Sequence, residues 1–223
     1  MKLFITTKNL DYIRNTQEIE LLTKECGGCR PDIIASSAGK YPARMAHVIR
    51  KLITCRFSDY DEIFVGFAPQ LIIPFFEGKF RRYRNDGGKV TIDFFISVYD
   101  TLVNDRKKIK KGSVPASVAA WLDKRTISLA DNVVVDTKAH GKYFTENFGL
   151  SMDKMQVLYL EADKSVYYPH TVKRAEEDAD KRIVLYFASM LPLQGVETVL
   201  EAAKLMKDDK NIIFKIIGKF YMF

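Results

Sequence analysis

The segment NVVVDTKAHGKYFTENFG, residues 132–149, places a strand directly before a helix. Its first half is a run of valines rather than an alternation of apolar and polar residues. Such a run is typical of a strand that is buried on both faces of a parallel sheet. The second half favours a helix that ends at Gly149, because glycine suits the position just after a helix. Together the two halves indicate part of a βαβ unit.

The same order of strand and helix repeats along the chain. Apolar runs predict strands at 2–7, 31–37, 60–67, 89–99, 132–137 and 154–160, with helices at 15–25, 41–54, 113–130 and 138–149. Asn15, with Glu18 three residues later, is expected to cap the first helix. This alternation predicts an α/β fold with a doubly wound, Rossmann-like parallel sheet. Ligands of such sheets bind beyond the carboxyl ends of the strands.

A polar, charged stretch follows the last of these strands and indicates a boundary. We predict a first domain at 1–168, a linker at 169–181 and the start of a second domain at 182–223. The last segment contains a strand, a helix and a second strand. One βαβ unit of this size is too small to form an independent core.

The composition limits the classes of function. Hydrophobic residues make up 47% and charged residues 28%, no apolar run has the length of a membrane span, and no signal peptide is evident, so we expect a cytoplasmic protein. The net charge of +7 is concentrated in the basic runs 79–84 and 105–111. These runs suit phosphate groups on an anionic membrane surface or a sugar nucleotide, and the alternative for each is a solvated loop. No nucleic-acid-binding motif accompanies them, so no nucleic-acid partner is expected.

Two further classes find little support. The CGGC motif at 26–29 lies between a helix and a strand, which favours a glycine-rich turn over a redox or zinc site. No G-x-G-x-x-G motif follows the first strand, which argues against a dinucleotide-dependent oxidoreductase. We expect no cofactor and no metal.

Three segments carry a resemblance to a known family. The segment VLYFASMLPLQGVETVLEAAKLMKDDKNIIFKIIG (184–218) resembles the start of the C-terminal domain of GT-B glycosyltransferases of family 4. The segments 128–150 and 157–169 are similar to that family's last N-domain elements. The resemblance implies an N-terminal, acceptor-side domain followed by the start of a nucleotide-sugar-binding domain. It also implies transfer of a hexosyl group, with retention, from a nucleotide sugar to a glycan or lipid-linked acceptor.

The resemblance assigns roles to residues at two places. The family's Gly-Arg pair and Pro-x-Lys-Gly turn bind the donor diphosphate, and the matching positions here hold Ser189, Gln194 and Gly195. Both cations are therefore absent, and weaker donor binding is expected because neutral donors bind phosphate more weakly than charged ones. The family's His-Asp pair corresponds to Tyr99 and Asp100, the catalytic candidates. The alternative for Asp100 is that it caps the following turn.

Other candidates lie in loops expected at the same edge of the sheet. We expect contacts to the acceptor or to phosphate from a set of mostly charged residues: Lys8, Asn9, Arg14, Lys40, Asp105 and Arg106. His140, near the start of a helix, is more simply explained as a surface or capping residue.

Two hypotheses of different classes remain. The first is the glycosyltransferase, peripheral at the inner membrane face and truncated within the donor domain, so that the chain alone is expected to be inactive. The second is a non-catalytic Rossmann-like binding module that associates with an anionic surface or a protein partner.

Overall fold

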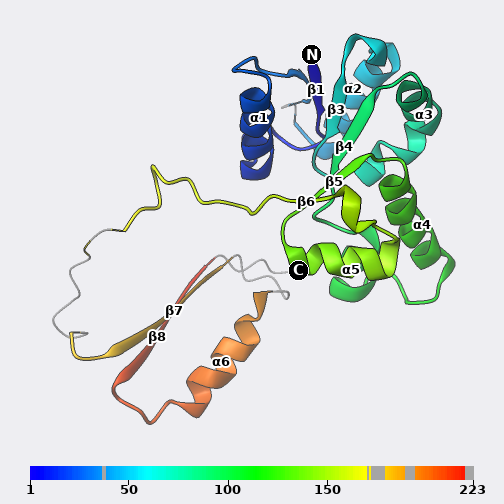
Figure 1. The fold of residues 1–223 in the computed structure, drawn as a ribbon. Coiled ribbons are helices and arrows are strands. Elements are labelled where there is room, and N and C mark those ends of the chain that lie inside the picture. The colour runs from blue at the N-terminus through cyan, green and yellow to red at the C-terminus, as the bar shows by residue number, and fades with distance from the viewer. Residues whose placement is uncertain (37–38, 170, 172–178, 189–193, 219–223) are drawn as a thin grey trace. The chain divides into compact units, whose positions relative to one another are not determined.

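The computed structural model describes residues 1–223 except 37–38, 170, 172–178, 189–193 and 219–223 (Figure 1). The chain forms two compact units, Met1–Glu161 and Ala162–Phe223.

The first unit is built on a parallel sheet of six strands. The order across the sheet is β2-β1-β3-β4-β5-β6, and every neighbouring pair is parallel. The strands are β1 (Lys2–Ile5), β2 (Asp32–Ile34), β3 (Glu62–Val65), β4 (Lys89–Asp93), β5 (Asn132–Val135) and β6 (Met155–Val157). The order turns at β1, which lies between β2 and β3, as it does in doubly wound sheets. The predicted fold class is confirmed.

Five helices connect these strands. They are α1 (Ile13–Glu25), α2 (Tyr41–Thr54), α3 (Glu77–Asn85), α4 (Val114–Ser128) and α5 (Lys138–Phe148). Figure 1 shows α1 on one side of the sheet and α2, α3 and α4 on the other. Short 3₁₀ turns and a π-helical turn at Asp100–Asp105 complete the connections.

The face covered by α2 to α5 holds the larger apolar core. Alternate strand residues, such as Ile63, Ile92 and Val133, point into this core and are fully buried. The helices contribute aromatic and aliphatic side chains, among them Leu52, Phe80, Ile127, Phe144 and Phe148. We call this side of the sheet the apolar face.

The opposite face, covered by α1, combines a small apolar cluster with buried polar groups. Phe4, Phe64 and Val134 pack against Ile19 and Leu22 of α1. A polar row crosses the strands beside this cluster. Lys2 Nζ lies 2.8 Å from Glu62 Oε2. The Thr91 hydroxyl donates to Glu62 Oε1 (2.5 Å) and accepts from the Asn132 side-chain amide (3.2 Å). We call this side the polar face.

The second unit contains one βαβ unit. β7 (Arg182–Ala188) and β8 (Ile212–Gly218) are parallel, and α6 (Val196–Leu205) connects them. Several large apolar side chains of this unit are exposed, including Leu185, Phe187 and Leu205. The predicted linker 169–181 lies largely outside the described residues.

Four expectations about local structure are corrected or confirmed. The first helix begins at Ile13, so Asn15 is not its cap but is buried in the first turn, where its side chain donates to the Asn9 carbonyl (2.7 Å). The strand expected at 89–99 ends at Asp93.

The basic run 79–84 is not a loop but lies in α3, because Phe80 and Tyr83 bury one side of a helix. The turn at 26–29 is confirmed: Gly27 and Gly28 have positive φ, and both cysteines are free.

Candidate functional site

The carboxyl ends of the six parallel strands meet at one edge of the sheet. Polar residues gather there: Thr6 and Thr7 follow β1, Asp93 ends β4, and Asp136 follows β5. This edge is where doubly wound sheets bind ligands, because the connections after the strands leave a crevice there. We take it as the candidate site.

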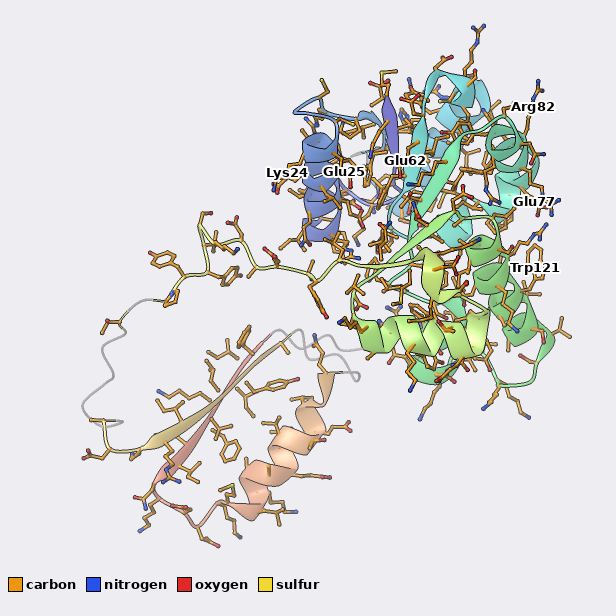
Figure 2. The ribbon with its side chains drawn as sticks, viewed as in Figure 1. Lys24, Glu25, Glu62, Glu77, Arg82 and Trp121 are labelled. Atoms are coloured by element: carbon orange, nitrogen blue, oxygen red, sulfur yellow. The ribbon has the colours of Figure 1, made fainter. Side chains whose placement is uncertain are left out.

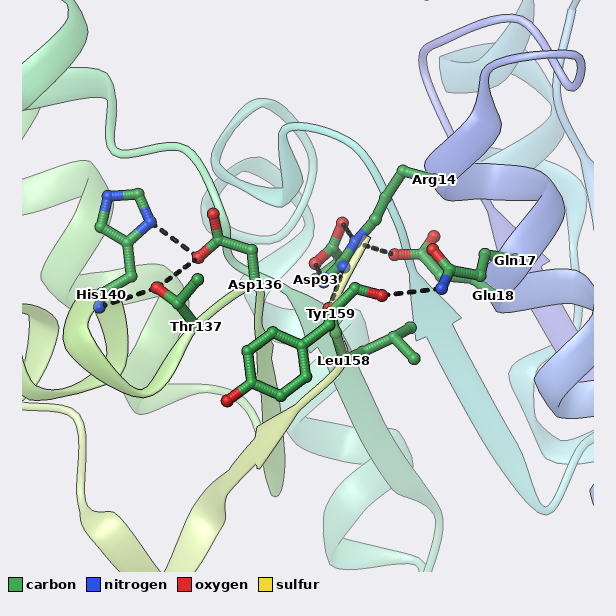
Figure 3. A network of polar contacts seen from close by, with 9 residues as sticks. All are labelled: Arg14, Gln17, Glu18, Asp93, Asp136, Thr137, His140, Leu158 and Tyr159. Atoms are coloured by element: carbon green, nitrogen blue, oxygen red, sulfur yellow. Dashed lines mark hydrogen bonds and ion pairs between the residues drawn. The ribbon is translucent and has the colours of Figure 1, made fainter. Parts of the chain in front are cut away.

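A buried ionic cluster supports the middle of this edge. The Arg14 guanidinium binds both carboxylate oxygens of Asp93, with Nη2 2.8 Å from Oδ1 and Nε 3.2 Å from Oδ2. The Glu18 carboxyl lies 3.3 Å from Nε of the same arginine, and Nη1 donates to the carbonyl of Leu158. Arg14 is only 2% exposed. Figure 3 shows Arg14 reaching from α1 to the end of β4, while Gln17 of the same helix donates to the Tyr159 carbonyl (2.7 Å).

Burial sets the protonation of the cluster. Desolvation, together with the nearby Asp93 charge, raises the pKa of Glu18 well above its ordinary value. Burial alone would lower the pKa of Arg14, but its hydrogen bond to Asp93 and the charges around it outweigh that effect and raise it. The arrangement therefore favours one charged pair, Arg14 with Asp93, beside a carboxyl that resists ionisation.

Arg14 was predicted to contact acceptor or phosphate, and that role stays a prediction. Its guanidinium is already bound on both edges within the protein, so a phosphate would compete directly with Asp93. Among the described residues its visible function is to join α1 to β4 and to the end of β6.

Lys8 and Asn9 lie together after β1. Lys8 Nζ is 5.5 Å from the centre of the Tyr12 ring and 5.1 Å from that of the Phe67 ring. Lys8 and Asn9 are both half-buried. Arg44 of α2 donates to the Asn9 side chain. Lys40 is exposed at the start of α2. The structure thus brings Lys8 and Asn9 together, and their contacts with ligand stay predictions.

A buried carboxylate holds the connection after β4. Asp123 of α4 accepts from the backbone N–H groups of Val98 (3.0 Å) and Tyr99 (2.9 Å). It also accepts from the Ser97 hydroxyl (2.7 Å) and from the Gln70 amide (3.0 Å). Burial raises the pKa of Asp123, although these hydrogen bonds oppose the shift. This carboxylate fixes the start of the helical turn that carries the predicted catalytic pair.

The two catalytic candidates differ in their surroundings. Tyr99 packs its ring against Phe148 and the apolar core. Asp100 begins the π-helical turn, and its Oδ1 accepts from the Tyr143 hydroxyl (2.6 Å) and from the Asn104 amide (2.6 Å). Burial and the hydrogen bond to Asp100 raise the pKa of Tyr143 to about 12, which keeps this hydroxyl a donor.

Asp105 ends the π-helical turn, and the exposed Arg106 follows it. The exposed lysines of 107–111 continue from there toward the start of α4. The expected contacts of Asp105 and Arg106 with ligand stay predictions.

Sequence reasoning missed one polar pair. His140 Nδ1 lies 2.7 Å from Oδ1 of Asp136, so His140 is paired rather than isolated. The signal was present: Asp136 directly follows a strand, and His140 stands four residues later, on the first turn of the next helix.

The second unit holds the predicted donor-phosphate turn. Gly195 has φ of 70° and stands at the N-cap of α6, a left-handed conformation that favours glycine. The Tyr186 hydroxyl of β7 donates to the Gln194 carbonyl (2.9 Å). Ser189 lies outside the described residues. Phosphate binding by this turn stays a prediction.

Metal-binding clusters and membrane-spanning helices are both absent from the described residues. No group of three or more His, Cys, Asp or Glu residues there could hold a metal ion. Within the same part of the chain, every helix is too short or too polar to cross a membrane.

Comparison with known proteins finds similarity among solved structures but not among family models or curated proteins. No family model and no curated protein matches the sequence. Among solved structures, the chain is similar to Anabaena Alr3699/HepE, crystallised in complex with UDP-glucose, with 11% sequence identity and a TM-score of 0.46. The match covers 97% of this chain and 69% of that one. A similarity of this size does not by itself assign a function to this chain.

Proposed function

We propose that the protein takes part in glycosyl transfer from a nucleotide sugar to a glycan or lipid-linked acceptor, with retention of configuration. In this proposal the first unit is the acceptor-side domain, and β7, α6 and β8 begin the donor domain. Asp100 is the catalytic candidate, and the turn at Gln194 and Gly195 faces the donor diphosphate.

The observation that carries this proposal is the backbone conformation of Gly195 at the N-cap of α6. The sequence resemblance aligns Gly195 with the glycine of the family's phosphate-binding turn, and Gly195 has a positive φ, which glycine adopts without strain. The backbone N–H groups at the start of a helix attract anions, so this turn suits a diphosphate even with Gln194 in place of lysine. The loss of two cations makes weak binding the expectation.

Nucleoside diphosphates test this turn in the chain as it stands. In an amide NMR titration of the 223-residue protein, we expect UDP or GDP to shift the Gly195 and Val196 signals in the millimolar range. The matching nucleosides, which lack phosphate, are the control and should leave these signals in place. If no nucleoside diphosphate moves either signal, the assignment of the turn is wrong.

A chimera tests the transfer itself. The remainder of the donor domain from a family 4 transferase with a known donor would be joined after Gly218. We expect the chimera to release nucleoside diphosphate from that donor, and Asp100→Asn to reduce the rate with the fold retained. A folded chimera that binds the donor and never turns it over would contradict the proposal.

The outer side of α4 supports a peripheral position at an anionic membrane. Val114, Val118 and Trp121 follow one another at helical spacing and are 78%, 50% and 53% exposed. Trp121 projects from the outer side of α4 in Figure 2. The exposed lysines of 107–111 lie directly before this helix. Apolar side chains beside a basic loop match the boundary of an anionic bilayer. The same surface also favours the second candidate, a non-catalytic module on that membrane.

Vesicle binding tests this surface directly, because Trp121 is the single tryptophan of the chain. We expect its fluorescence to shift to the blue with phosphatidylserine-containing vesicles and to stay unchanged with phosphatidylcholine alone. Val118→Asp should weaken this binding, whereas Ser128→Asp, at the far end of the same helix, serves as a charge-matched control. Binding without any turnover by the chimera would favour the non-catalytic module, and no response to anionic vesicles would exclude this surface.

A further inference from the structure

We infer that Asp136 and His140 form a site for the hydroxyl group of a saccharide acceptor, in which Nε2 of His140 accepts the hydroxyl proton. The inference rests on the proposed function for the chemical class of the ligand. It names a position on the acceptor side that the sequence resemblance does not assign.

The connection between β5 and α5 fixes both side chains. Asp136 directly follows β5, and Thr137 caps α5 by accepting from the His140 N–H (3.1 Å). The Asp136 carboxylate also accepts from the Thr137 hydroxyl (3.3 Å). Both residues therefore occupy the carboxyl edge of the sheet, where the strand order places ligands.

The imidazole is held in a defined orientation. Its Nδ1 is 2.7 Å from Asp136 Oδ1, and its ring stacks on the buried Phe144 at 5.0 Å between centroids. Because a carboxylate oxygen only accepts, Nδ1 carries the proton and Nε2 of the neutral ring keeps its lone pair. Figure 3 shows the second ring nitrogen turned away from Asp136. The His140 side chain is 46% exposed, so a ligand can reach it.

The next turn of α5 connects this pair to Asp100. Tyr143 stands three residues after His140, and its hydroxyl donates to Asp100 (2.6 Å). The positive charge of Arg14, from α1, interacts with Asp136 on the other side. An imidazole, a tyrosine hydroxyl and two carboxylates thus lie along one edge, and this set matches the alternating donors and acceptors of a sugar.

The chemistry needs a proton acceptor on this side. Because configuration is retained, the acceptor oxygen forms its bond on the face of the anomeric carbon from which the diphosphate departs, and the diphosphate leaves with the electron pair of the broken bond. The hydroxyl proton must be taken up, and Nε2 of His140 is placed to take it. Asp136 then stabilises the imidazolium that results.

Saccharide titration of the 223-residue chain tests the site without any donor. We expect at least one of methyl glucoside, methyl mannoside and N-acetylglucosamine to shift the His140 ring signal saturably in the millimolar range. In the variants, which lack this ring, binding is read from the Gly141 amide signal. His140→Ala should weaken the binding about tenfold, because a hydrogen bond is lost. His140→Gln should restore part of it, since its amide oxygen can accept. His47→Ala, on α2, is the matched control and should change nothing.

The pH dependence of saccharide binding distinguishes an Nε2 that accepts a hydrogen bond from one that donates it. Asp136 is the charged group bound to the ring, Arg14 interacts electrostatically with Asp136, and Asp100 is bound by Tyr143 one turn further along α5. If Nε2 accepts, binding weakens once the ring is protonated at low pH, and the ring signal reports that protonation directly. Three results would overturn the inference: no saccharide shifts the signal, His140→Ala binds as the natural protein does, or binding persists once the ring is protonated. The response of Gly195 to nucleoside diphosphates reports on the proposed function separately.

Discussion

The two faces of the six-stranded sheet are held by different kinds of interaction. The apolar face buries side chains that need only close packing, such as Ile92 under α2 to α5. The polar face buries Arg14, Glu18 and Asp93 under α1, where charge and hydrogen bonding must be matched. Ile92 and Asp93 are adjacent in β4 and point to opposite faces, so one strand contains both kinds of contact. Packing on the first face tolerates small changes in side-chain size, whereas the second face depends on the charge pairing of Arg14 with Asp93.

The largest effect is expected from Arg14→Met, which keeps an apolar chain of similar length and removes the guanidinium. Asp93 would be left buried without its ion pair, and we expect a loss of about 3–5 kcal/mol in the free energy of unfolding. Urea denaturation measures this loss. The double variant Arg14→Met with Asp93→Leu is the control and should recover part of it, because no charge is left unpaired. Similar stability of the single and double variants would contradict this account of the polar face.

Glu18→Gln should change how stability depends on pH. The folded pKa of Glu18 is raised above its ordinary value of 4.5, so the folded state holds this proton where the unfolded state has lost it. The natural protein therefore loses stability relative to the variant as the pH rises above that value, by up to about 1.4 kcal/mol per pH unit. Unfolding of both proteins over a pH series measures the difference. A difference that is constant with pH would show that Glu18 is ionised in the fold.

Ile92→Val tests the apolar face at the neighbouring position. It removes one methylene group from a fully buried side chain, and we expect a loss of about 1 kcal/mol. This loss should not depend on pH, in contrast to the effect of Glu18→Gln. A cost as large as that of Arg14→Met would mean that the two faces do not differ in tolerance.

The smallest effect is expected from Arg82→Met on the outer side of α3. Its guanidinium is 3.9 Å from Asp86, and its side chain is 87% exposed. Water already solvates both charges, so the free energy of unfolding should stay the same within error. A clear loss would show that charge pairing matters outside the polar face as well.

The strands could be predicted because an apolar run of neighbouring residues is enough to indicate a buried strand. The Val and Ile residues of 62–65, 89–93 and 132–135 fit a sheet that is buried on both faces, and those strands formed as expected. The run through Phe94 and Ile96 looked like more strand, but Asp123 binds the backbone of Val98 and Tyr99 and turns the chain into a helix there. That contact joins residues far apart in the sequence.

The candidate site was harder to predict because it, too, depends on contacts between residues that are far apart in the sequence. Arg14 and Asp123 each stand in a polar stretch that suggests an exposed side chain, and both are buried because a distant partner completes them. Asp136 and His140 are four residues apart, so their pairing could be seen in the sequence. Tyr99 and Asp100 were singled out by resemblance, and only the structure shows that Tyr143 holds Asp100.

The pairing of β1 bears on how the chain folds during synthesis. β1 is made first, yet it lies between β2 and β3, so its apolar residues wait for later strands before they are covered. From β3 onward, each new strand pairs with the one made just before it. The sheet can therefore grow outward from β1 in the order in which the ribosome delivers the strands, whereas Leu3, Phe4 and Ile5 are fully covered only once the helices and later strands that pack on them have been made.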